Sequence, residues 1–132
     1  MAEATTKTKR MGRMPAALLA KVRQVGELAA DKKARDIRAF DVRGLTLMAD
    51  AFVLCSVGSE PQLRAVTSSA REEMKEKGFR VLRVEGDHQC GWLIVDYGDV
   101  IFHVFRDKAR EFYDLDRLWA DAPEIKLELD KA

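Results

Sequence analysis

Residues 91–105 read GWLIVDYGDVIFHVF, an apolar stretch that Asp96, Gly98 and Asp99 interrupt near its middle. Aspartate and glycine favour tight turns, whereas the β-branched and aromatic residues on either side favour strands. The stretch therefore predicts two adjacent strands joined by a turn around Gly98. Upstream, residues 51–57 read AFVLCSV. A short, uniformly apolar run of this kind is typical of a central strand that is buried on both faces.

The spacing of apolar residues predicts the other elements, because a helix repeats its buried face about every 3.6 residues and a strand every second residue. In chain order, the sequence predicts a helix that begins at Pro15, strands at 37–42 and 51–57, a helix at 60–77 before Gly78, a strand at 79–86, the two strands of 91–105, and one or two short helices before Pro123. This order, α-β-β-α-β-β-β-α, predicts an α/β (α+β) fold in which helices flank a mixed five-stranded sheet.

A chain of 132 residues is long enough to form one domain with its own core. We expect that domain at residues 15–123, with a flexible basic arm at 1–14 and a charged tail at 124–132 that is either frayed or an added edge strand. The net charge of +1 argues against a protein that coats polyanions, although contact between the basic arm and RNA stays open. No apolar run approaches the roughly 20 residues that span a bilayer, so we expect a cytoplasmic protein without a membrane segment.

Asp96, Asp99 and His103 lie within residues 91–105 and invite comparison with a metal site or an acid–base site. Four residues of regular strand separate Asp99 from His103 by about 13 Å. A metal ion lies only about 2–2.5 Å from each of its ligands, so the three side chains cannot share one ion. We therefore predict turn and surface roles for the aspartates, and we expect no catalytic residue, no metal and no cofactor.

Gly58-Ser59 follows a predicted buried strand and precedes a predicted helix. Nucleotidyltransferases use a strand, a Gly-Ser turn and a helix in this order to present a phosphate to the helix N-terminus. Their chemistry also needs paired carboxylates that hold Mg²⁺. No Asp-x-Asp follows Ser59, because the next residues are Glu60, Pro61 and Gln62. The scaffold can thus be related to these transferases, but the sequence predicts no transferase activity.

Aromatic residues and arginines are concentrated in the last third of the chain, near predicted turns and helix ends. Tryptophan, tyrosine and arginine are enriched among the contacts that dominate protein–protein binding. Tyr97 lies at the predicted turn, where we expect its side chain to be exposed. No dense basic stripe accompanies the aromatic residues, which argues against a nucleic-acid platform. The residues concerned are Trp92, Tyr97, Phe102, Phe105, Phe112, Tyr113 and Trp119, with Arg106, Arg110, Asp114 and Arg117.

Five segments resemble the ribosomal silencing factor family, also called the Iojap family. The segments are DVRGL (41–45), ADAFVLCSVGS (49–59), EG (85–86), GWLIVDYGDVIFHVF (91–105) and REFYDLDRLW (110–119). The resemblance implies a nucleotidyltransferase-like fold without transferase activity. It further implies a repressor of translation that binds ribosomal protein L-fourteen on the large ribosomal subunit and sterically blocks association of the small subunit under nutrient limitation.

The resemblance also implies a set of partner-binding residues. The family surface uses a tryptophan, the residue at the hairpin tip and a tyrosine of the terminal helix, which correspond to Trp92, Tyr97 and Tyr113. Asp96 and Arg110 are the neighbouring polar residues that we expect to contact the partner. The chain departs from the family pattern in two places: many members have leucine where it has Tyr97, and many carry Thr-Gly-Thr-Ser-x-x-His where it reads SVGSEPQL, residues 56–63.

Two alternatives stay open at this point. The first is a nucleotide-handling enzyme on the same scaffold, with Glu85, Asp96 or Asp99 binding Mg²⁺. The second is a general adaptor that uses the same aromatic residues for other proteins. In either case, or as a silencing factor, free chains could form a homodimer through the aromatic surface.

Overall fold

The computed structural model describes residues 12–129, so most of the predicted basic arm and the last residues of the predicted tail lie outside the described residues. In chain order the elements are α2 (Ala16–Asp31), β1 (Arg35–Asp41), β2 (Ala51–Val57), α3 (Glu60–Glu76), β3 (Arg83–Asp87), β4 (Trp92–Asp96), β5 (Val100–Arg106), α4 (Asp107–Tyr113) and α5 (Leu115–Leu118). The predicted order of elements is confirmed, with two short helices after the last strand.

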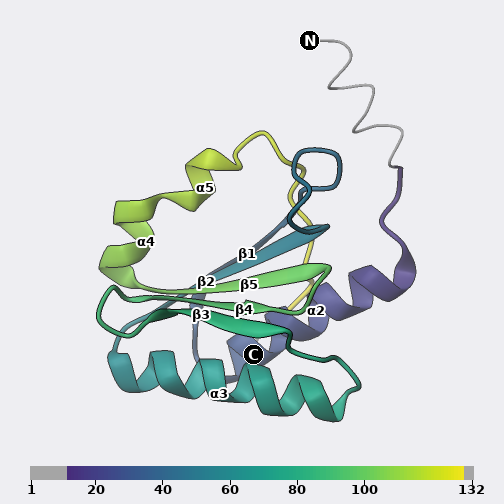
Figure 1. Ribbon diagram of the computed structural model, residues 1–132. Coiled ribbons are helices and arrows are strands. Elements are labelled where there is room, and N and C mark those ends of the chain that lie inside the picture. Colours follow the sequence, from purple (N-terminus) through teal and green to yellow (C-terminus); the bar gives the residue numbers. More distant parts are fainter. Residues whose placement is uncertain (1–11, 130–132) are drawn as a thin grey trace.

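The strands form one five-stranded sheet in the order β1-β2-β5-β4-β3. β2 and β5 run parallel, and the other neighbouring pairs are antiparallel, so the sheet is mixed as predicted. Helices α2 and α3 cover one face of the sheet, and the shorter α4 and α5 lie on the other (Figure 1). We refer to these two sides as the α2/α3 face and the α4/α5 face.

Alternate residues of the central strands divide between two hydrophobic clusters, one on each face. On β2, Val53 and Cys55 pack on the α2/α3 face, whereas Phe52 and Leu54 pack on the α4/α5 face. Every residue of β2 is buried, as its uniformly apolar sequence predicted. The adjacent β5 is buried except at Arg106, so these two parallel strands form the centre of the molecule.

The strand predicted at 79–86 is shorter than expected, because β3 begins only at Arg83. Residues 79–82 connect α3 to the sheet, and the Phe79 backbone N–H donates to the Met74 carbonyl at the end of α3, at 2.8 Å. Phe79 and Val81 both pack against the cluster on the α2/α3 face. The alternation that predicted a strand is therefore produced by a loop that turns every second side chain inward.

The described part of the C-terminal tail runs beside the edge strand β1. The Asp41 N–H donates to the Pro123 carbonyl and the Ile125 N–H donates to the Ala39 carbonyl, each at 2.8 Å. Beyond them, Leu127 is only 8% exposed and joins the cluster on the α2/α3 face. This segment pairs briefly with the sheet edge and is then held by its leucine, so it is not frayed as far as residue 129.

Candidate partner-binding surface

A cluster of aromatic rings lies on the α4/α5 face, where β4 begins. Trp92, the first residue of β4, pairs in register with Phe105 of β5, and the two rings stack with centroids 5.1 Å apart. Tyr113, the last residue of α4, lies against the same indole with a centroid separation of 4.6 Å. Phe112 contacts Tyr113 edge to face at 5.0 Å. The fold thus brings together Trp92 and Tyr113, two of the predicted partner-binding residues, and adds Phe112.

The loop before β4 lets α4 approach Trp92 closely. Gly91 has a φ of 74°, a conformation that glycine adopts without strain. A Cβ atom added to Gly91 would lie 3.3 Å from the Arg106 Cβ and 3.4 Å from the Ala109 Cβ. The Gly91 carbonyl also accepts a hydrogen bond from the Arg106 N–H at 2.8 Å. A side chain at this position would be strained by the positive φ and would crowd the first turn of α4.

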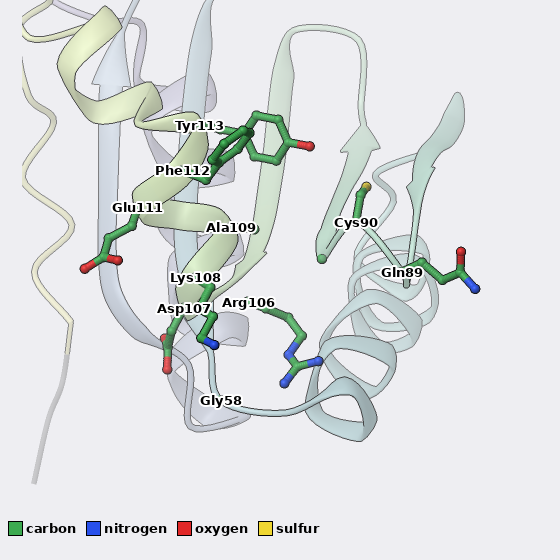
Figure 2. Close-up of a pocket in the computed structure, with 11 residues that line it drawn as sticks. Gly58, Gln89, Cys90, Arg106, Asp107, Lys108, Ala109, Glu111, Phe112 and Tyr113 are labelled. Atoms are coloured by element: carbon green, nitrogen blue, oxygen red, sulfur yellow. The ribbon is translucent and has the colours of Figure 1, made fainter.

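Two rings of the aromatic cluster around Trp92 project into solvent. Phe112 is 80% exposed and Tyr113 is 38% exposed, while Trp92 is half-buried beneath them. A groove follows α4 from these rings to its first turn, where the side chains of Arg106 and Lys108 extend towards Gly58 (Figure 2). We call Trp92, Phe112 and Tyr113 the aromatic surface. Asp107 and Glu111 line the same groove, so its charge is mixed, and exposed rings with an arginine nearby are the composition expected of a protein-binding site.

The family resemblance did not place Phe112 among the partner-binding residues, although the concentration of aromatic residues in the last third of the chain included it. Its spacing from Leu115 and Trp119 predicted only that it lies on a short helix. Neighbouring residues of a helix point about 100° apart, so Phe112 and Tyr113 cannot both face the sheet. Helix α4 has 7 residues and buries only Ala109, so adjacent aromatic residues at the end of so short a helix were the signal that could have revealed the surface.

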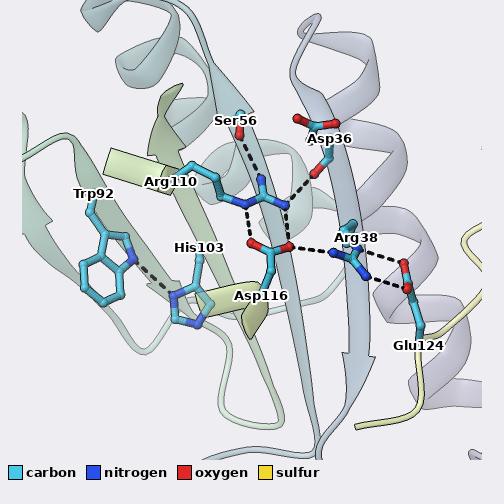
Figure 3. Close-up of polar contacts among 8 residues, drawn as sticks. All are labelled: Asp36, Arg38, Ser56, Trp92, His103, Arg110, Asp116 and Glu124. Atoms are coloured by element: carbon cyan, nitrogen blue, oxygen red, sulfur yellow. Dashed lines mark hydrogen bonds and ion pairs between the residues drawn. The ribbon is translucent and has the colours of Figure 1, made fainter. Parts of the chain in front are cut away.

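Arg110 anchors α4 to the sheet (Figure 3). Its guanidinium binds both carboxylate oxygens of Asp116, with N–O distances of 2.7 and 2.9 Å. It also donates to the Ser56 hydroxyl of β2 at 2.8 Å and to the Asp36 carbonyl of β1 at 3.0 Å. The hydrogen bonds from Arg110 hold the pKa of Asp116 below its usual range. Arg110 is therefore occupied within the molecule, where the sequence had predicted a contact with a partner.

Asp116 links this anchor to the edge of the sheet. Arg38 of β1 donates to Asp116 at 3.1 Å and pairs with Glu124 at 2.9 Å (Figure 3). Two arginines thus share one carboxylate and connect β1, α5 and the C-terminal segment. Charge-assisted and bidentate bonds of this type are stronger than neutral hydrogen bonds, so the network fixes the position of α4 and α5 over the sheet.

The expectation that Tyr97 is exposed at the hairpin tip is wrong. The Tyr97 N–H donates to the Val100 carbonyl at 2.9 Å, so the turn itself consists of Gly98 and Asp99. Tyr97 is the last paired residue before the turn, and strand alternation places it with Leu93 on the α2/α3 face. Its side chain is 5% exposed, and its hydroxyl donates to the Ala70 carbonyl of α3 at 2.8 Å. The side chain supports the core and does not belong to the aromatic surface.

Asp96 stabilises the turn of the hairpin. Its Oδ1 accepts the Gly98 N–H at 2.7 Å, and its Oδ2 lies 3.3 Å from the Arg83 Nε of β3. Asp96 and Trp92 stand at opposite ends of β4, about 13 Å apart at the usual rise of a strand. The structure therefore does not bring Asp96 next to the aromatic surface, although both residues lie on the same face of the sheet.

The Gly-Ser turn before α3 is closed by groups of its own chain. The Ser59 hydroxyl caps the helix by accepting the Gln62 N–H at 3.2 Å, and the Gln62 Oε1 accepts the Gly58 N–H at 2.9 Å. Two of the backbone donors at this helix start, the N–H groups of Gly58 and Gln62, are thus already bonded within the chain. Among residues 12–129, no group of three His, Cys, Asp or Glu side chains could hold a metal ion. This part of the molecule gives no support to the nucleotide-handling alternative.

The fold is that of an α/β (α+β) domain in which helices flank a mixed five-stranded sheet. The family model described as "Ribosomal silencing factor during starvation" matches residues 15–132. The ribosomal silencing factors of Halalkalibacterium halodurans and Bacillus subtilis are each 40% identical to the chain over 98 residues, which is 74% of this chain and 84% and 83% of theirs. The chain belongs to the ribosomal silencing factor family.

Relatives outside these bacteria and solved structures agree with this assignment. The chloroplastic Iojap protein of Zea mays is 31% identical over 106 residues, 80% of this chain and 46% of that protein. A crystal structure from Chromobacterium violaceum has a TM-score of 0.70 and 30% identity, over 81% of this chain and 88% of that one. One from Bacillus halodurans has a TM-score of 0.68 and 32% identity, over 85% and 99%. Along the described residues, no helix is both long and apolar enough to cross a membrane.

Proposed function

We propose that this chain silences ribosomes by binding the large ribosomal subunit through its aromatic surface. The observation that carries the proposal is the exposure of Phe112 and Tyr113 over a half-buried Trp92, in a chain that belongs to the ribosomal silencing factor family. Large exposed rings cost solubility in a free protein and are typical of a binding site. The relatives named as ribosomal silencing factors support the ribosome as the target.

The docking partner that we propose is ribosomal protein L-fourteen, and the proposed mechanism is steric. A domain bound to the face of the large subunit that meets the small subunit prevents the two from joining, and no chemical step is required. A standard interface of about 800 Å² on each partner, with a few aromatic anchors at its centre, provides sufficient affinity. The internal hydrogen bonds of Gly58 and Gln62 fit a role that needs no bound nucleotide.

Phe112→Ala and Tyr113→Ala test the placement of the surface. Each variant should bind large subunits about tenfold or more weakly, because truncation of an aromatic anchor removes most of its contact area. Phe112 is 80% exposed, so its variant should keep the stability of the parent protein. Trp92 is a less clean choice, because its removal also breaks the stack on Phe105. Binding is measured by sedimentation with purified large subunits, and function by the shift of ribosomes to free subunits in a sucrose gradient.

Leu47→Ala is the matched control, because Leu47 is a fully exposed apolar residue in the loop between β1 and β2. It should bind large subunits like the parent. Equal binding by Phe112→Ala, Tyr113→Ala and the parent would show that the surface is misplaced. A parent protein that fails to sediment with large subunits would refute the proposed function itself. Capture of isolated L-fourteen by the parent, and not by the two variants, tests the proposed partner.

A further inference from the structure

His103 occupies an unusual place for a polar side chain. It lies in the middle of β5, is 4% exposed, and is surrounded by rings on the α4/α5 face. The Phe52 ring meets it edge to face at 5.0 Å, and the rings of Trp92 and Phe105 lie 5.9 and 6.2 Å away. A phenylalanine would fit the composition of this layer, so packing alone does not explain why the position holds a histidine.

One polar contact distinguishes His103 from an apolar ring. The Trp92 Nε1–H donates to the His103 Nδ1 at 3.2 Å (Figure 3). Because an indole nitrogen can only donate, the Nδ1 atom must be the acceptor and the imidazole proton must be on Nε2. The Nε2 atom is buried, and no group within residues 12–129 forms a hydrogen bond with it. His103 thus places an acceptor, Nδ1, beneath Trp92 and leaves its Nε2–H donor without a partner among the described residues. A buried donor without a partner lowers stability.

The charge state of His103 suits this contact. Burial lowers the pKa of its imidazole to about 3, so the ring is neutral at any pH near 7. A neutral ring keeps the lone pair of Nδ1 free to accept the indole hydrogen. The hydrogen bond also fixes the rotation of the indole, which stacking on Phe105 alone leaves undetermined.

We infer that His103 is a positioning residue for partner binding: its Nδ1 holds the indole of Trp92 in the orientation that supports Tyr113 and completes the aromatic surface. This inference rests on the proposed function and deepens it. Without an acceptor at Nδ1, the Nε1–H of the half-buried Trp92 would turn towards water. Tyr113, which lies 4.6 Å from the indole, would then lose its fixed support. Preorganised anchors lose less conformational freedom on binding, so a loose ring lowers affinity.

Two substitutions separate the acceptor from the packing. His103→Phe keeps an aromatic ring in the layer and removes the acceptor. His103→Asn keeps an oxygen where Nδ1 stands and removes most of the ring, which leaves a cavity. A purely structural role predicts that His103→Asn is the more damaging change in every assay. A positioning role predicts that His103→Phe disturbs the orientation of Trp92 and the binding to large subunits more than His103→Asn does.

The test measures hydrogen exchange of the indole N–H by nuclear magnetic resonance and binding to large subunits by sedimentation. The chain has two tryptophans, so Trp119 is an internal reference. In His103→Phe we expect the Trp92 indole N–H to exchange at least about tenfold faster, with the Trp119 signal unchanged, and binding to large subunits to weaken about tenfold. In His103→Asn, binding per folded molecule should remain within about threefold of the parent and the Trp92 indole should stay protected.

Unchanged protection of Trp92 in His103→Phe would overturn the inference, because the hydrogen bond would then not fix the ring. Faster exchange with undiminished binding would also overturn it, because the orientation of Trp92 would then not matter to the partner. Binding that follows stability, with His103→Asn the weaker variant, would reduce His103 to a packing residue. A parent protein that does not bind large subunits would instead refute the proposed function, and the exchange data would still decide whether His103 positions Trp92.

Discussion

The two faces of the β4–β5 hairpin contain the same kinds of side chain but use them differently. On the α2/α3 face, Tyr97 is buried and its hydroxyl is satisfied by the Ala70 carbonyl. On the α4/α5 face, Trp92 is half-buried, its indole N–H is satisfied by His103, and His103 keeps an unsatisfied donor. On the α2/α3 face the tyrosine is buried with its hydroxyl bonded, whereas the α4/α5 face combines exposed rings with a buried histidine nitrogen that lacks a partner among the described residues.

The difference follows from the helices that cover the two faces. Helix α3 has 17 residues and runs along the sheet, whereas α4 has 7 residues and ends at Tyr113. A long helix buries a complete apolar stripe, but a short one leaves the rings of its last turn without cover. Local composition therefore does not decide whether an aromatic residue is core or surface. The length of the opposing helix decides it, and a short helix must be held in place by other means.

The largest expected effect comes from removing the anchor of that short helix. Arg110→Met should lower the free energy of unfolding by about 3 kcal/mol, because it leaves the carboxylate of Asp116 and the Ser56 hydroxyl without their main donor. Loss of the anchor should also open the α4/α5 face and weaken binding to large subunits. Urea unfolding measures the change. Arg117→Met is the control: Arg117 is exposed, and no ion pair to it is found among the described residues, so its loss should have little effect.

The ion pair between Arg110 and Asp116 also predicts how the stability lost in Arg110→Met depends on pH. Arg110 lowers the folded-state pKa of Asp116 below the unfolded value of about 3.9. The stabilisation is then complete above the unfolded pKa and is lost as pH falls through the lower folded pKa. The stability difference between the parent and Arg110→Met should accordingly be constant from pH 7 to about 5 and should shrink below pH 4. A difference that grows in acid would contradict this assignment of the ion pair.

His103 on the α4/α5 face gives a second prediction about how stability depends on pH. Burial lowers the folded-state pKa of His103 to about 3, whereas the unfolded value is about 6.5. The unfolded chain therefore binds a proton that the folded chain rejects, and stability is lost as pH falls below 6.5. Between pH 7 and pH 5 the parent should lose about 2 kcal/mol more than His103→Phe. Unfolding in urea at pH 7, 6 and 5 measures both slopes, and equal slopes would mean that His103 is accessible to protons in the folded state.

The buried strands of the fold could be predicted from the sequence, whereas the exposed residues of the α4/α5 face could be predicted only in part. The apolar run at 51–57 predicted β2 residue by residue, and Trp92 was recognised at the start of its strand. Tyr97 was misplaced because a shift of one residue in the turn moves a strand residue to the other face. The alternation of Leu93, Val95 and Tyr97 indicates correctly that the three side chains lie on the same face, which is the α2/α3 face.

The internal bonds of Arg110 and the exposure of Phe112 arise from tertiary contacts that no local pattern encodes. Arg110 looks like a binding residue in sequence because arginine is common in interfaces, yet its partners include Ser56, which is 54 positions away. The sequence grouped Phe112 with the other aromatic residues without deciding between core and surface, and α4 is too short to bury it. Both features depend on the orientation of one helix over the sheet, which long-range ion pairs rather than local composition determine.

The smallest expected effect compares the two tyrosines directly. Tyr97→Phe removes the hydroxyl that donates to the Ala70 carbonyl, so it should lower the free energy of unfolding by about 1 kcal/mol. It should leave binding to large subunits unchanged, because the ring stays buried on the α2/α3 face. Tyr113→Phe should leave stability unchanged within about 0.5 kcal/mol, since no hydrogen bond to its hydroxyl is found among the described residues. If Tyr97→Phe instead weakens binding at unchanged stability, Tyr97 reaches the partner and the two faces are not divided as closed core and open surface.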